Sequence, residues 1–148
     1  MNQFFDEIKI VAVDFDNTLT LDNPYPEVGK PNLEAIEILK EFRNNGGKVI
    51  LWSCRYGEPL EKALALCKTY GLVFDAINDN LPEQTAKWRA AHPDDEMMSM
   101  SRKIYADLYI DDRDPRNLIR GGVDWNAVCM LLHRKTLDMF NNRIVEIA

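Results

Sequence analysis

Short apolar runs alternate along this chain with stretches of helical periodicity. The first run spans residues 8–13, Ile-Lys-Ile-Val-Ala-Val, and further runs follow at 48–52, 73–77 and 106–110. Runs of this length that are rich in Ile and Val are typical of buried strands in a parallel sheet. Because helical patterns fill the intervals, the sequence predicts an α/β fold: a Rossmann-like, three-layer, doubly wound parallel sheet with helices on both faces.

The helical segments are delimited by proline, glycine and aspartate. Helices are predicted over residues 31–44, 59–70 and 81–102, the last interrupted at Pro93, and a final helix begins at Asp124. The apolar positions of that final helix recur at helical spacing: Val128, Leu131, Leu132 and Leu137.

The chain is long enough to form one domain with a sizeable core. It has 148 residues, of which 46% are hydrophobic and 28% charged. Chains of about this length bury roughly 70% of the surface that their unfolded form exposes. No repeat, linker or low-complexity segment divides the sequence, so residues 1–148 are predicted to form a single domain.

Cysteine usage and apolar run lengths point to a cytoplasmic protein. Cys54, Cys67 and Cys129 form no CxxC pair and cannot all pair with one another, which is typical of a reducing compartment. The apolar runs are far shorter than the roughly 20 residues that span a bilayer, and residues 1–7 lack the basic flank of a signal peptide. We therefore expect no membrane partner. The formal net charge of -6 repels polyanions and argues against a nucleic-acid partner.

Polar residues follow three of the predicted strands at the point where each strand ends. Asp14 and Asp16 follow the first, Ser53 the second, and Asp111 with Asp112 the fourth. In an open parallel sheet these carboxyl ends share one edge, where ligands bind, and residues i and i+2 of an extended segment point the same way. Four acids in one crevice repel one another unless a cation lies among them, and oxygen ligands of this kind suit Mg²⁺.

These residues resemble the signature motifs of the haloacid dehalogenase (HAD) superfamily of phosphohydrolases. Residues 14–20, Asp-Phe-Asp-Asn-Thr-Leu-Thr, resemble its DxDxT motif. Ser53 resembles the second motif, Lys103 the third and residues 110–112 the fourth, in the order that the superfamily shows. The run from 106 to 113 is similar to the corresponding run of the 5'-deoxyribonucleotidase branch. Four motifs in order on an alternating α/β chain, over residues 8–120, are a specific signal.

The resemblance implies a magnesium-dependent phosphomonoesterase with an aspartyl-phosphate intermediate. It implies that Asp14 is the nucleophile and that Asp16 is the general acid and base. Hydroxyl groups of Thr18 and Ser53 are expected to bind the phosphoryl oxygens, and Lys103 supplies a positive charge there.

The same resemblance implies the ligands of a Mg²⁺ ion. They are Asp14, the main-chain carbonyl of Asp16, and Asp112, with Asp111 adjacent; which of the last two binds the ion directly stays open. Arg55, just past Ser53, is expected either to contact the substrate anion or to pair with an acid.

The superfamily's substrate-covering cap has no place in this chain. About thirty residues separate Thr18 from the second strand, and a helix fills most of them, while residues 81–101 leave room for a small lid at most. A capless member has an open crevice. We therefore expect a small or medium phosphate ester as substrate, with a homo-oligomer covering the site through residues 81–101 or the final helix.

Simpler interpretations stand beside these. The aspartates could be turn residues, Ser53 a strand-end hydroxyl and Lys103 a solvated lysine next to Arg102. A signalling receiver domain also clusters acids and a lysine on a parallel sheet, but its acid pair after the first strand is adjacent, and its acceptor aspartate is on the third strand, where this chain has only Asp75. A non-catalytic phosphate-binding domain on the same fold is the remaining alternative.

Overall fold

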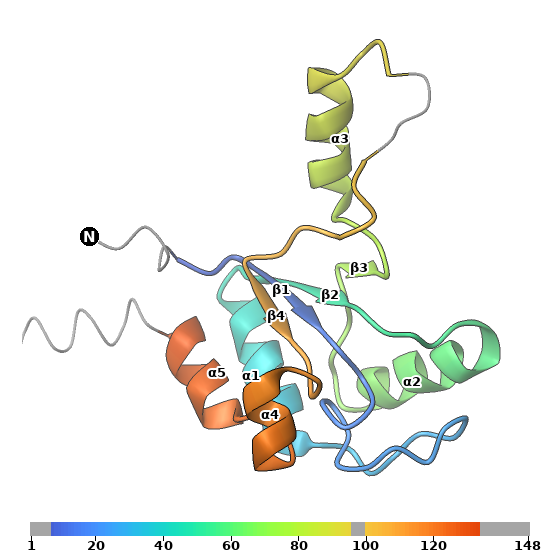
Figure 1. Cartoon of the computed structure of the whole chain (residues 1–148), viewed down its shortest axis with the longest axis vertical. Coiled ribbons are helices and arrows are strands. Elements are labelled where there is room, and N and C mark those ends of the chain that lie inside the picture. The colour runs from blue at the N-terminus through green and yellow to red at the C-terminus, as the bar shows by residue number, and fades with distance from the viewer. Residues whose placement is uncertain (1–6, 96–99, 134–148) are drawn as a thin grey trace, which may run out of the picture.

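The computed structural model describes residues 7–95 and 100–133, and Leu137 of the predicted final helix lies outside them. Strands and helices alternate through most of the chain (Figure 1). In order they are β1 (Ile10–Val13), α1 (Leu33–Asn44), β2 (Lys48–Leu51), α2 (Gly57–Thr69), β3 (Ala76–Ile77), α3 (Pro82–Ala91), β4 (Leu108–Ile110), α4 (Pro115–Arg120) and α5 (Trp125–Leu132).

The four strands form one parallel sheet in the order β3-β2-β1-β4. The central strand β1 pairs with β2 and β4 on its two sides, so that Val13 lies beside Leu51 and Ile110. All four strands run the same way, and their carboxyl ends therefore meet at one edge. The predicted α/β class and the Rossmann-like parallel sheet are confirmed.

Most of the hydrophobic core lies on one face of the sheet. Val11 and Val13 of β1 point into it together with apolar residues of α1, α2 and α5. Helix α1 places four buried residues on one face, namely Ala35, Ile36, Leu39 and Phe42. Its N-cap is Asn32, whose side-chain oxygen accepts a hydrogen bond from the Ala35 N–H, so the helix begins just after the predicted Pro31.

Within the described residues, the opposite face of the sheet is not packed by a full layer of helices, in contrast to the predicted arrangement with helices on both faces. Its buried cluster joins β1 and β2 residues to Leu81, Ile104 and Ala106, which belong to connecting segments. Helix α3 contains no buried residue and projects from the sheet on the side away from α1 and α5 (Figure 1). Of the predicted helix over 81–102, residues 82–91 are helical and residues 92–95 and 100–102 are not, while 96–99 lie outside the described residues. The helix ends two residues before Pro93, which cannot continue it.

The segment between β1 and α1 is a closed loop and not an inserted domain. Thr20 and Pro31 form an antiparallel bridge at its base, and the Leu21 N–H donates to the Lys30 carbonyl. Ten residues, 21–30, lie outside this bridge. None of the helices in the described residues has the length and apolar character needed to cross a bilayer.

Candidate functional site

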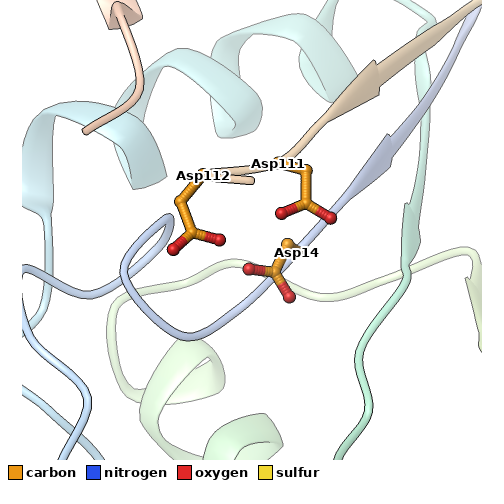
Figure 2. A group of neighbouring side chains, drawn as sticks. All are labelled: Asp14, Asp111 and Asp112. Atoms are coloured by element: carbon orange, nitrogen blue, oxygen red, sulfur yellow. The ribbon is translucent and has the colours of Figure 1, made fainter. Parts of the chain in front are cut away.

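Three carboxylates meet at the carboxyl edge of the sheet. Asp14 comes directly after β1, and Asp111 and Asp112 come directly after the neighbouring strand β4. The Asp14 N–H donates to the Ile110 carbonyl at 2.9 Å, which extends the β1–β4 pairing to the residues that bear the acids. Figure 2 shows the three side chains turned toward a common space, and one oxygen from each lies within 4.8 Å of the others.

The electrostatics of this group favour a bound cation. Burial, and after it repulsion from Asp111, raises the pKa of Asp14 from 3.8 to about 7. Burial and the neighbouring Asp111 also raise the pKa of Asp112 above its usual range. Carboxyl groups that resist ionisation next to one another become stable as carboxylates once a positive ion compensates their charge.

The donor set fits magnesium or a similar hard cation. Carboxylate oxygens are the ligands that Mg²⁺, Ca²⁺ and Mn²⁺ prefer. Within residues 7–95 and 100–133, Asp14, Asp111 and Asp112 form the one group of acidic, thiol or imidazole side chains able to hold a metal ion. The predicted ligands Asp14, Asp111 and Asp112 therefore do come together, and Asp16 contributes no side-chain oxygen to the group.

The turn after β1 orients Asp14. Thr18 is buried, and its hydroxyl donates to Asp14 Oδ2 at 3.1 Å. The N–H groups of residues 18–20 all lie within hydrogen-bond distance of the Phe15 carbonyl, and Asn17 adopts a left-handed conformation with φ of 58°. This tight turn brings Thr18 back toward Asp14. A bound phosphoryl oxygen would compete with Asp14 for the Thr18 hydroxyl proton.

Asp16 points to a different partner from the one expected. Its two carboxylate oxygens accept hydrogen bonds from Arg55 at 2.8 and 2.7 Å. Asp16 therefore lies outside the group formed by Asp14, Asp111 and Asp112, and its approach to the same ligand as Asp14 stays a prediction. The i, i+2 argument assumes an extended segment, but β1 ends at Val13 and the chain already turns at Asp16. Of the two alternatives for Arg55, pairing with an acid is the one observed.

Ser53 lies beside the site and is tied to the neighbouring strand end. Its N–H donates to the side-chain oxygen of Asn78, which follows β3, and its hydroxyl oxygen accepts from the Arg55 N–H at 3.1 Å. Ser53 thus stands at the predicted edge, and its contact with phosphate stays a prediction. Asn78, in a left-handed conformation with φ of 51°, was not singled out from the sequence, although asparagine after a strand is typical of such a turn.

Lys103 is not joined to the acid group in this structure. It is exposed, and its ammonium lies 4.9 Å from the centre of the Tyr109 ring. No ion pair involving Lys103 is formed within the described residues. Its contact with a phosphoryl group stays a prediction, and it would require the side chain to leave this ring.

A second asparagine missed by the sequence analysis fixes the β4 turn. The buried Asn117 side chain donates to the Asp111 carbonyl and to Asp114, both at 2.8 Å. Asp114 also caps helix α4, accepting from the Asn117 N–H. The pair Asp114-Pro115 is a helix-start signal, so α4 could have been predicted from the sequence. The helix start carries Asn117, whose side chain holds the Asp111 carbonyl.

A cavity of about 310 Å³ lies at the end of β3, and none of the three acids lines it. Asn78 lines it, and the same Asn78 side chain contacts the backbone of Ser53 and Arg55. The cavity continues between α3 and residues 100–104, where Trp88, Arg89 and Arg102 line it.

Comparison with known proteins finds a solved structure with the same fold. The solved structure of a conserved protein from Bacteroides thetaiotaomicron superposes on this chain with a TM-score of 0.67 and 34% sequence identity, over 88% of this chain and 93% of that one. The chain belongs to the family of that Bacteroides protein. No family model and no curated protein matches the sequence. Membership in the Bacteroides protein's family therefore establishes the fold and leaves the chemistry to be argued from the site.

The raised pKa of Asp14 predicts how stability depends on pH and metal. Because the folded protein binds this proton more tightly than the unfolded chain, the metal-free fold loses stability as pH rises from 3.8 through about 7. Asp14→Asn should therefore raise the melting temperature of metal-free protein by several degrees at about pH 8 and by less at about pH 5.

With Mg²⁺ present, the wild type should have a higher melting temperature than Asp14→Asn. Calorimetry at about pH 8 should show Mg²⁺ raising the melting temperature of the wild type and raising that of Asp14→Asn much less, because the ion stabilises the state that binds it. Asp94→Asn, an exposed aspartate outside the site, is the matched control and should respond to Mg²⁺ like the wild type. An equal Mg²⁺ effect in all three proteins would contradict the metal site.

Proposed function

We propose that this protein is a magnesium-dependent phosphomonoesterase of the HAD type, which acts through an aspartyl-phosphate on a small or medium phosphate ester. The observation that supports this best is the half-buried Asp14, placed against Asp111 and Asp112 and hydrogen-bonded by Thr18. A carboxylate at the end of a central strand, with a cation site around it, is what an attacking group for an anionic substrate needs.

The proposed reaction has two displacements at phosphorus. An Asp14 oxygen attacks, a bond from Asp14 to phosphorus forms, and the ester P–O bond breaks with its electron pair on the leaving oxygen, which takes a proton from Asp16. Water then attacks the same phosphorus and gives a proton to Asp16, while the bond to Asp14 breaks and phosphate leaves. Mg²⁺ held by the three acids would neutralise charge on the carboxylates and the phosphoryl oxygens.

The small or medium size of the ester stays a prediction. The cavity at the end of β3 is lined by Arg89, Arg102 and Trp88 but also by Asp79, and by none of the three acids, so it does not decide the size of the substrate. Assembly into a homo-oligomer stays a prediction.

The order of the strands argues against a receiver domain. In this sheet β1 lies between β2 and β4, whereas the flavodoxin-like order places β1 between β2 and β3. Asp75 precedes β3, so it does not stand at the carboxyl edge, and it is used structurally: both its oxygens bond Arg43, and it also accepts from the Val49 N–H. An aspartate held in this way is not a free phosphoryl acceptor.

A panel of phosphate esters tests the proposal. Purified protein with Mg²⁺ should release inorganic phosphate from an aryl phosphate and from some nucleotides or phosphorylated metabolites. A protein that releases phosphate from none of them, while Mg²⁺ still raises its melting temperature, would contradict the phosphatase and leave only a metal-binding domain.

Asp16→Asn should separate proton transfer from phosphate binding. General acid or base help is worth about 10²- to 10⁴-fold, so kcat/KM for an alkyl phosphate should fall by that amount. The loss should be smaller for an ester whose leaving group needs no proton. Inhibition by inorganic phosphate should change little. A loss that appears entirely as weaker phosphate binding would contradict the assignment of Asp16.

A further inference from the structure

Arg55 is unusual because its charge is almost completely buried, which is rare for arginine. The residue as a whole is 2% exposed, and its side chain is the largest of the fully buried side chains in the described residues. A buried guanidinium is tolerated only when its charge and its N–H groups are satisfied. The identity of its partners therefore shows what the residue holds in place.

All the donors of Arg55 are used inside the protein. Nε and Nη2 bond the two oxygens of Asp16, Nη2 also donates to the Glu27 carbonyl at 2.7 Å, and Nη1 donates to the carbonyls of Pro26 and Pro59 at 3.0 and 3.1 Å. These bonds account for the five N–H groups of a guanidinium. Arg55 has none left for a substrate anion.

Two aromatic rings complete the surroundings of the guanidinium. Its central carbon lies 5.1 Å from the centre of the Phe15 ring and 5.2 Å from that of Tyr25. Planar stacking and a bidentate fork are properties of arginine that lysine lacks. The site therefore requires arginine for its shape as well as for its charge.

The partners of Arg55 come from three separate segments. Asp16 belongs to the turn after β1, Pro26 and Glu27 to the closed loop 21–30, and Pro59 to the first turn of α2. We infer that Arg55 is a positioning residue that fixes the Asp16 carboxylate against loop 21–30 and α2, so that Asp16 can exchange a proton with the leaving oxygen. This inference rests on the proposed phosphatase reaction.

The geometry leaves Asp16 able to work while it is held. A carboxylate offers about four acceptor positions, of which the Arg55 fork takes two. The Asp16 side chain is 17% exposed, whereas that of Arg55 is 1% exposed, so part of the Asp16 side chain remains accessible while Arg55 does not. Arg55 thus limits the directions in which Asp16 presents a proton and still leaves Asp16 able to take part in the reaction.

The test compares Arg55→Lys with a matched control. Arg43 forms a second bidentate pair, with Asp75, at 3.0 and 2.9 Å, so Arg43→Lys makes the same chemical change without touching Asp16. For an alkyl phosphate, Arg55→Lys should lower kcat/KM by about 10- to 100-fold, since misplacing a proton donor has effects of that size. For a dinitrophenyl phosphate the loss should be severalfold smaller.

A double-mutant cycle identifies the route of the effect. In an Asp16→Asn background, Arg55→Lys should change kcat/KM for the alkyl phosphate less than about threefold, because the group that it positions is already gone. Arg43→Lys should lower the melting temperature while leaving the dependence on the leaving group unchanged. If Arg55→Lys does not fold, Tyr25→Ala removes one flanking ring from a half-exposed position and should give the same pattern with a smaller loss.

The outcomes separate this inference from the proposed function. A wild type inactive on every ester would contradict the phosphatase and the inference with it. An active wild type whose Arg55→Lys and Tyr25→Ala variants lose equal activity on both esters, or lose it equally with and without Asp16, would overturn the positioning role alone.

Discussion

Asp14→Asn is expected to abolish turnover. Asn cannot form the acyl phosphate through which the reaction is proposed to pass, so kcat should fall by more than about 10⁴-fold on every ester tested. The fold should remain, because the substitution removes a carboxyl whose pKa is already raised by burial and by Asp111. Circular dichroism and phosphate release measured on the same preparation give the two readouts.

Asp94→Asn provides the control for that loss. It makes the same substitution at an exposed position outside the acid group and should keep wild-type turnover. An Asp14→Asn protein that folds and retains more than about a tenth of wild-type activity would exclude Asp14 as the attacking group, since nucleophile losses are orders of magnitude larger.

Removal of divalent metal should have an effect of similar size. Without a cation, the three acids repel an anionic ester and Asp14 stays partly protonated near neutral pH, because burial and Asp111 raise its pKa to about 7. A chelator should therefore reduce phosphate release to background, and excess Mg²⁺ should restore it. The measurement is initial rate against free Mg²⁺ at fixed ionic strength.

The control for the chelator is the same chelator saturated with Mg²⁺ beforehand, which should leave the rate unchanged. Activity that is equal with free and with saturated chelator would show that the acid group does not act through a metal. Because Asp111→Asn and Asp112→Asn each remove one of the three acids, each should raise the Mg²⁺ concentration needed for half-maximal rate. The larger increase identifies the direct ligand.

The parallel sheet and the acid group were predictable because both depend on local pattern. Apolar runs predict the strands, and the residues that end these runs mark the carboxyl ends of the strands. A parallel sheet brings those ends to one edge, independently of the conformation of the loops. Asp14, Asp111 and Asp112 therefore met as expected. Strand β3 is shorter than its apolar run suggested, since only Ala76–Ile77 pairs with β2.

The partners of Asp16 and Lys103 were not predictable in the same way. The bond from Asp16 to Arg55 spans 39 positions, and it depends on a turn that begins where the extended pattern was assumed to continue. Asn78 and Asn117 hold backbone groups, a function that any asparagine in a loop can have and that sequence spacing does not reveal. The thin cover over the second face follows from α3, whose polar sequence offers no apolar stripe.

Trapping the covalent intermediate tests the central claim most directly. Wild-type protein mixed with an active ester and Mg²⁺, then quenched in acid within the first turnover, should gain the mass of one phosphoryl group, and peptide mapping should place it on Asp14. Asp16→Asn should accumulate more of the adduct, because hydrolysis of the intermediate loses its base. If both the wild type and Asp16→Asn turn over the ester and neither gains this mass on Asp14, the account is contradicted.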